Sequence, residues 1–159
     1  MIALGSLLVA ALMGCGKHGD AAESPPPLLI DERGVTMPFE RAVQHIRFHP
    51  FLPSRQILAY AVIAPLGDVD NDAHRGIAME YVANGKAMLL SQWPKQHYTI
   101  AFQKNAAELP PCTPQHYAPL GIAWVTPRDV VMTVQPDGNV PIRALDAEAR
   151  RLLRAGACR

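Results

Sequence analysis

The sequence lacks an excess of charge of either sign. Its 15 Lys and Arg residues nearly balance 14 Asp and Glu residues, giving a formal net charge of +1 at pH 7. Aromatic residues are also few, at 6% of the chain, and no basic stripe with interleaved aromatic residues occurs. Proteins that bind nucleic acid carry such basic patches because these neutralise phosphates. The composition therefore argues against a nucleic-acid-binding protein.

The sequence also lacks a hydrophobic run of the roughly 20 residues that a mature transmembrane helix needs. Ile2–Met13 is almost wholly apolar and is followed by Gly14 and Cys15. This length is typical of the apolar core of a signal peptide, with residues 1–14 removed at export. A signal peptide usually begins with a positive charge, and none precedes Lys17. We therefore expect the true start of the protein to lie upstream of Met1.

The residues Leu12-Met13-Gly14-Cys15 resemble the lipobox of bacterial lipoproteins. In that family the cysteine thiol carries a diacylglyceryl group, and a small residue before it gives the peptidase access. The resemblance implies cleavage before Cys15, lipidation with palmitate-type chains, and a membrane-anchored protein of the cell envelope. Gly16 stands where Asp would retain a lipoprotein at the inner membrane, which favours the outer membrane, facing the periplasm. The alternative is a buried apolar helix with a chance cysteine.

The segment after Cys15 has the composition of a tether. Residues 16–27 are polar, contain glycine and end in Pro25-Pro26-Pro27, which predicts a flexible linker that stiffens toward its end. We assign residues 15–34 to this tether and residues 35–159 to a single domain. A domain of that size can bury about two-thirds of its unfolded surface, which is enough for a core.

Only three cysteines are present, and two remain if Cys15 carries lipid. In an oxidising compartment two remaining thiols usually pair, so we expect a disulfide between Cys112 and Cys158. The alternative is Cys112 as a nucleophile with His116 nearby. That chemistry needs a thiolate and an orienting third group, for which the sequence offers no signal.

Periodicity predicts a helix at each end of the domain. Thr36–Ile46 has a capping Thr36, a proline in its first turn and apolar residues at helical spacing. A second helix is expected from Asp146, as its cap, to about Arg154, with arginines toward its C-terminal end.

Between these helices the sequence predicts about six strands. Asn84-Gly85 is a strong hairpin signal, and Asn105–Tyr117, with three prolines, is expected to be a long loop. The expected fold is α+β: one antiparallel sheet with an N-terminal and a C-terminal helix packed on it. The expected strands are Ile57–Ala64, Ile77–Val82, Ala87–Gln92, Tyr98–Gln103, Ile122–Thr126 and Val130–Gln135.

The stretch Leu28–Gln92 resembles an extracytoplasmic domain of anti-sigma-factor-like proteins. It is more distantly similar to the RseB/MucB and LolA class of lipid-contacting sheet proteins. The matching features are the first helix, Phe51-Leu52-Pro53 entering a strand, and the hairpin Ile77–Gln92. The resemblance implies an envelope location and contact with a protein or lipid. It assigns no role to any single residue, and it covers less than half of the chain.

Two patterns in the sequence partly match metal sites. Asp68-x-Asp70-x-Asp72 is similar to the start of a calcium loop, but Ala73 and Met79 stand where that loop needs Gly and Glu. A solvated loop is the preferred interpretation. His45 and His49 are four apart, but Pro50 disturbs helical geometry there and no third ligand follows, which favours surface histidines. We expect no metal and no cofactor.

Catalytic patterns are equally sparse. Neither Ser54 nor Ser91 lies in a Gly-x-Ser-x-Gly turn, and scattered carboxylates are usually solvated. The carboxylates considered were Glu80, Glu108 and Asp129. Four aromatic residues are interpreted as core rather than as a ligand groove: Trp93, Tyr98, Phe102 and Trp124.

The first hypothesis is therefore a non-enzymatic, lipid-anchored envelope domain that binds a protein or another envelope component. The second is a carrier or sensor for a lipid or small apolar ligand, which needs an apolar cavity of some hundreds of Å³. The third is a small hydrolase with carboxylate or histidine chemistry, which needs titratable groups that converge in a cleft.

Overall fold

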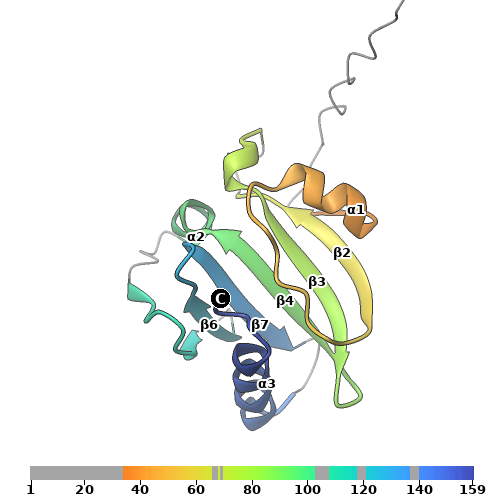
Figure 1. Cartoon of the computed structure of the whole chain (residues 1–159), viewed down its shortest axis with the longest axis vertical. Helices are drawn as coiled ribbons and strands as arrows, with labels where there is room; N and C mark the ends of the chain where they lie inside the picture. Colours follow the sequence, from red (N-terminus) through yellow and green to blue (C-terminus); the bar gives the residue numbers. More distant parts are fainter. Residues whose placement is uncertain (1–33, 66–67, 69, 103–107, 118–120, 137–139) are drawn as a thin grey trace, which may run out of the picture.

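The computed structural model describes residues 34–65, 68, 70–102, 108–117, 121–136 and 140–159. They form a seven-stranded antiparallel sheet in the order β1-β2-β3-β4-β7-β6-β5 (Figure 1). The predicted α+β class with one antiparallel sheet is confirmed, with seven strands in place of about six. The elements are β1 (Val35–Thr36), α1 (Phe39–Ala42), η1 (Val43–His45), β2 (Ile57–Ile63), η2 (Asp72–His74), β3 (Gly76–Ala83), β4 (Lys86–Pro94), α2 (Lys95–Phe102), β5 (Gln115–Tyr117), β6 (Gly121–Val125), β7 (Val130–Pro136) and α3 (Ile142–Arg154).

The β3–β4 hairpin forms where the sequence predicts it. Asn84 and Gly85 have φ angles of 52° and 72°, the left-handed conformation that a tight hairpin turn requires. Ala83 pairs with Lys86 directly across this turn.

The predicted strand Tyr98–Gln103 is wrong, because Lys95–Phe102 is the helix α2. Tyr98, Ile100 and Phe102 alternate as in a strand, but Tyr98 and Phe102 are also four apart, as on one helix face. Pro94 immediately before the helix lacks an N–H that a helix start would leave unpaired. The Thr99 hydroxyl donates to the Lys95 carbonyl at 3.1 Å, a bond that helical geometry allows.

The first helix is shorter than predicted. Thr36 does not cap it but belongs to β1, where it pairs with Ala61 of β2. Pro38 is the residue before the helix, which spans Phe39–Ala42 and continues as the 3₁₀ turn Val43–His45. Pairing with the sheet edge takes precedence over the local capping preference of threonine.

The C-terminal helix is longer than predicted. It begins at Ile142, after Pro141, and ends at Arg154 as expected. Asp146 therefore lies inside the helix, where it pairs with His116 (3.0 Å between Oδ1 and Nε2). Pro141 was the sequence signal for this start, since proline fits the first residues of a helix.

The predicted loop Asn105–Tyr117 contains a short strand. Gln115–Tyr117 pairs with Gly121–Ala123 and forms the β5 edge of the sheet. Three residues next to several prolines are too short for a periodic sequence signal.

The sheet buries apolar residues on both faces, because successive side chains of each strand point to opposite sides. On one face α3 covers Trp124, Met88 and Leu90, while α1 covers Ile77 and other residues of β2 and β3. On the other face α2 places Tyr98 against Trp93 and Val131. In Figure 1 α1 and α3 lie toward opposite ends of the sheet, and the chain between α1 and β2 crosses it. Each fully buried large apolar side chain contributes about 1.5–3 kcal/mol.

Candidate binding groove

Three adjoining hollows lie along one end of the sheet. The largest, about 540 Å³, is open and is lined by Arg47, Ala73 and the acidic residues of the segment 68–72. Arg47 and Ala73 also line the second hollow, of about 170 Å³. The second shares Arg128 and Val130 with the third, of about 40 Å³. We call the second and third hollows together the groove.

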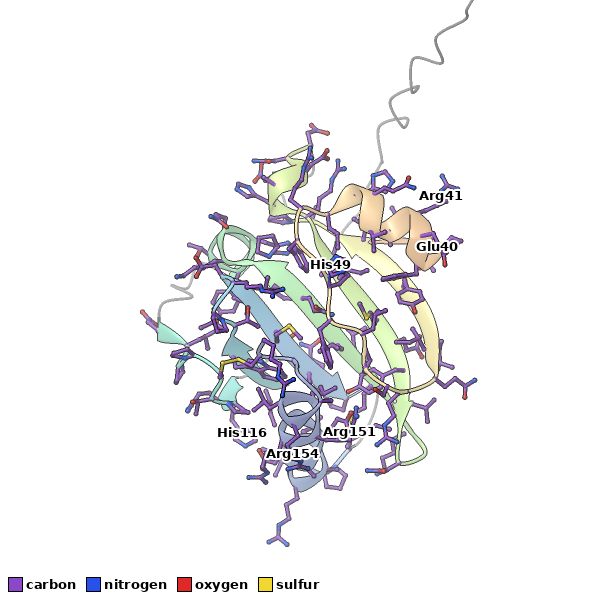
Figure 2. All side chains as sticks on the ribbon, viewed as in Figure 1. Glu40, Arg41, His49, His116, Arg151 and Arg154 are labelled. Carbon is purple, nitrogen blue, oxygen red and sulfur yellow. A yellow bond between two sulfur atoms is a disulfide. The ribbon has the colours of Figure 1, made fainter. Side chains whose placement is uncertain are left out.

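The first wall of the groove is the segment that crosses the sheet after α1. It contributes Arg47, Phe48, His49 and Phe51, and His49 lies centrally in Figure 2. Buried Gln92 holds this segment to the sheet: its Oε1 accepts the Phe51 N–H (2.8 Å) and its Nε2 donates to the Phe51 carbonyl (2.6 Å). One side chain thereby satisfies both backbone groups of Phe51, as a neighbouring strand would.

The second wall is the turn between β6 and β7. The Thr126 hydroxyl accepts the backbone N–H groups of Arg128 (3.3 Å) and Val130 (3.2 Å). Asp129 has a φ of 57° and pairs with Lys95 at 3.2 Å. This bonding fixes the backbone of the turn and leaves the Arg128 side chain exposed at the rim of the groove.

The C-terminal turn closes the groove beside this wall. Gly156 and Ala157 donate to the carbonyls of Leu153 (3.1 Å) and Leu152 (3.0 Å), the Schellman pattern that ends a helix, with Gly156 at φ 105°. A disulfide then joins Cys158 to Cys112, the pair expected from the sequence.

Cys112 is itself held to the sheet, since its N–H donates to the Val125 carbonyl at 2.9 Å. The disulfide therefore ties the wall formed by residues 156–159 to Cys112, which is in turn hydrogen-bonded to the strand β6.

The groove has an apolar floor and a cationic rim. Phe48, Val130 and Met132 line its base. The exposed side chains of Arg47, Arg128 and Arg159 stand around it, together with His49. Such a surface suits an extended partner that carries both apolar and acidic groups.

The acidic segment beside the groove is organised by ion pairs. Asp68 contacts His74, and Asp72 contacts Arg75. Asp72 also lies 3.6 Å from the guanidinium of Arg47. Of the three carboxylates in the calcium-loop pattern, Asp72 thus has two arginine partners and Asp68 contacts the His74 ring.

A buried histidine lies behind this segment. His97 is 3% exposed, its ring stacks on Trp93 with centroids 4.8 Å apart, and its Nδ1 lies 2.7 Å from the His74 carbonyl. A carbonyl only accepts, so Nδ1 carries the proton. Burial lowers the pKa of His97 to about 4, so this imidazole is neutral at physiological pH.

A second buried ionisable group attaches α3 to the sheet. Glu148 accepts hydrogen bonds from Arg151 (Nε at 2.9 Å, Nη2 at 2.5 Å) and from the Tyr81 hydroxyl at 3.1 Å. Burial alone would raise the pKa of Glu148, but the hydrogen bonds and charge of Arg151 bring it below its usual value. The same pair raises the pKa of Arg151, while burial and Glu148 raise that of Tyr81 well above its usual range.

The histidines and cysteines weighed from the sequence are dispersed. His45 is buried in η1, whereas His49 is exposed in the groove wall. His116 is partly exposed and pairs with Asp146. Within the described ranges, no group of three or more His, Cys, Asp and Glu side chains is placed to hold a metal ion. Cys15 lies outside the described residues.

The other candidates are also separated. Trp93 and Tyr98 belong to the core on one face of the sheet, and Trp124 to the core on the other. Ser91 is buried in β4, Ser54 is exposed, and Asp129 pairs with Lys95. Glu80 is half-buried in β3 and Glu108 is exposed. The side chain of Phe102 lies outside the described part of the chain.

Sequence reasoning missed the groove residues Gln92 and Arg128 and the contact between His97 and His74. Gln92 and Phe51 are 41 residues apart, and no local pattern indicates such a contact. The Thr126–Val130 turn carries a weak local signal in the sequence, namely a Thr three residues before an Asp. In the structure this Asp129 has a positive φ.

Comparisons with protein-family models, with curated proteins and with solved structures found no match. None of the helices in the described part of the chain is long and apolar enough to cross a membrane.

Proposed function

We propose that this chain is an exported lipoprotein of the cell envelope, anchored through a lipid on Cys15, whose domain binds an envelope partner without catalysing a reaction. The sequence argument is the apolar run before Leu12-Met13-Gly14-Cys15 and the tether that follows it. The anchor would place the domain at a membrane, with the outer membrane facing the periplasm as the favoured location.

The observation that carries the proposal is the disulfide that fixes one wall of the groove. Structural disulfides form in exported proteins and are rare in the reducing cytosol. Cys158 directly follows the residues 156–157 that line the groove, and Cys112 is bonded to β6. A bond that depends on export therefore shapes the surface that we assign to binding.

The two alternatives receive less support from the geometry. A lipid carrier needs an enclosed apolar cavity, whereas the hollow of about 540 Å³ is open and is lined by charged residues such as Arg47, Asp70 and Asp72. A hydrolase needs a titratable group that is free to meet a substrate. His97 is buried with Nδ1 committed to a backbone carbonyl, and Glu148 is held by Arg151 and Tyr81.

Site-specific photo-crosslinking in living cells tests the binding role. A photo-reactive phenylalanine analogue replaces exposed His49 in the groove wall, and a control replaces Arg41 on α1, which is also exposed (Figure 2). We expect one adduct of defined mass from the His49 position. We also expect that adduct to be lost when Arg128→Glu is added. Equal adducts from both positions, or no adduct from the groove, would contradict the proposal.

A further inference from the structure

The outer face of α3 carries an unusual stripe of arginines. Arg143, Ala147, Arg150 and Arg154 are all exposed and are spaced four, three and four residues apart. This spacing places them in one row along the helix. Arg154 lies at the lower end of the molecule in Figure 2.

Among the described residues, neither carboxylate of α3 forms an ion pair with this row. The helix has two acidic residues, and both are directed to other partners. Asp146 pairs with His116 of β5, while Glu148 is 2% exposed and is held by Arg151 and Tyr81. Asp146 lies three residues after Arg143 and four before Arg150, so the stripe has three exposed guanidinium groups beside one partly exposed carboxylate of its own helix.

The start of α3 departs from local helix preferences in two ways. A helix N-terminus favours acidic residues because its dipole is positive there, yet the first turn holds Arg143 and no acid. Ile142, the first helical residue, is 58% exposed, the largest value among the exposed large apolar residues of the described chain. The dipole explains Arg150 and Arg154 near the C-terminal end, but it does not explain Arg143. Local departures of this kind are expected where a surface is used for binding.

Charge is also divided between the two ends of the molecule. Lys86 is exposed at the β3–β4 turn, which lies at the same end as α3 in Figure 1. The acidic segment with Asp68, Asp70 and Asp72 precedes β3, at the opposite end of that strand. Arg47 and Arg128 line the hollows beside these carboxylates, so charge of both signs is mixed at that end, whereas the exposed charges of the α3 end are mainly positive.

We propose that the outer face of α3 docks on the surface of an anionic lipid bilayer, with Ile142 entering the interface and the arginines contacting lipid phosphates. The proposal rests on the proposed function in one respect, namely that the anchor on Cys15 supplies the bilayer. Each arginine near an anionic surface strengthens binding about fivefold, so three together give on the order of a hundredfold. Such binding is weak alone and becomes effective when a lipid anchor provides the second attachment.

The tether is long enough for this orientation. β1, where the domain begins, pairs with Ala61 and Val62, far from the Tyr81 region to which α3 is attached. The 20 residues 15–34 can span at most about 70 Å, and a domain of this size is only about 35 Å across. The α3 face and the anchor can therefore reach the same membrane.

The test is co-sedimentation of the full-length Cys15→Ala chain with two kinds of vesicle. One kind is phosphatidylcholine alone, and the other contains about 30–40% phosphatidylglycerol. The measured quantity is the ratio of the two partition coefficients, because any contribution of the apolar N-terminal run enters both. We expect a preference for anionic vesicles on the order of a hundredfold. The triple variant Arg143→Gln/Arg150→Gln/Arg154→Gln should lose this preference. Salt at about 0.5 M, which shortens the Debye length to about 4 Å, should suppress it. Circular dichroism verifies that each variant is folded.

Matched single variants locate the surface. Arg143→Gln lowers the preference about fivefold, whereas Arg41→Gln, an exposed arginine at the other end, changes it less than twofold. Ile142→Ser lowers binding to both vesicle types. Leu52→Ser, the control at another exposed apolar residue (44% exposed), leaves binding unchanged.

Equal preference in the triple variant and the parent would overturn the proposal. Binding to poly-L-glutamate without any preference for anionic vesicles would also overturn it and would identify an acidic polypeptide as the partner. Because the assay uses chains without a lipid on Cys15, its outcome is separate from the outcome for the anchor.

Discussion

Glu148 and His97 are both almost fully buried, with exposed fractions of 2% and 3%, yet Glu148 carries a charge and His97 does not. Glu148 is ionised because the guanidinium of Arg151 and the Tyr81 hydroxyl stabilise its carboxylate. His97 is neutral because burial dominates its pKa and its Nδ1 donates to a backbone carbonyl, which carries no charge. The comparison shows that the bonding partners decide whether a buried group carries charge.

The largest loss of stability is expected from removing the Glu148 cluster, by which we mean Glu148 with its partners Arg151 and Tyr81. Glu148→Ala leaves Arg151 without its partner in a partly buried site and should lower the free energy of unfolding by about 3–5 kcal/mol. Urea unfolding followed by circular dichroism measures this loss. The matched control is Glu40→Ala on α1, an exposed carboxylate, for which we expect a change within about 0.5 kcal/mol. Similar losses at both positions would contradict the comparison.

Acidification should affect the two groups in separate pH ranges. The pKa of His97 falls from 6.5 in the unfolded chain to about 4 in the folded protein. The folded state therefore binds fewer protons between these values. The resulting stability is present above pH 6.5, and about 3 kcal/mol of it is lost by pH 4. Glu148 has a pKa below its usual 4.5, so its contribution is present above pH 4.5 and is lost as the pH falls from there through the folded-state pKa.

Urea unfolding at several pH values between 7 and about 3 tests whether the two groups act in different pH ranges. In His97→Phe the ring can still stack on Trp93 but cannot titrate, so the slope between pH 6.5 and 4 should be reduced. A slope that is unchanged in this variant would assign the effect to another group.

Removing the hydrogen bond from Tyr81 to Glu148 should lower stability less than Glu148→Ala does. Tyr81→Phe deletes the hydroxyl that donates to Glu148 and leaves both bonds from Arg151 in place. We expect a loss of about 1–2 kcal/mol in urea unfolding. A loss as large as that of Glu148→Ala would mean that Tyr81, rather than Arg151, keeps the carboxylate ionised.

The smallest effect is expected at a buried polar group without a partner. Thr133 is fully buried in β7, and its hydroxyl has no hydrogen-bond partner among the described residues. Thr133→Val keeps the shape and removes the unsatisfied group, so stability should rise by up to about 1 kcal/mol. Thermal unfolding measures the gain, and a loss would indicate that the hydroxyl forms a bond in solution.

The parts of the fold that the sequence predicts are those with strong local signals. Asn84-Gly85 places the β3–β4 hairpin, and the apolar runs in β2, β6 and β7 locate their strands within one or two residues. The segment 98–102 was misassigned because five residues with alternating apolar character fit a strand and a helix equally well.

The groove could not be predicted, because five separated parts of the chain line it: residues near 47–51, 73, 92–96, 126–132 and 156–159. The Gln92–Phe51 bonds join residues 41 apart, and the disulfide joins residues 46 apart. The cysteine count predicted the disulfide, but not that it would fix a groove wall. Likewise, the helix dipole predicts Arg150 and Arg154 near the C-terminal end, but the exposed start at Ile142 and Arg143 was missed because the predicted cap, Asp146, lies five residues after the observed cap, Pro141.

The most direct test of the proposed function is the intact mass of the protein made in a bacterial host from its own upstream region, measured after separating membrane and soluble fractions. We expect a membrane-bound protein that lacks residues 1–14 and has the added mass of an acylated Cys15, and we expect Cys15→Ala to remain unacylated. A soluble, unmodified protein that retains residues 1–14 would contradict the account. It would also remove the reason to expect an oxidised Cys112–Cys158 pair in the cell.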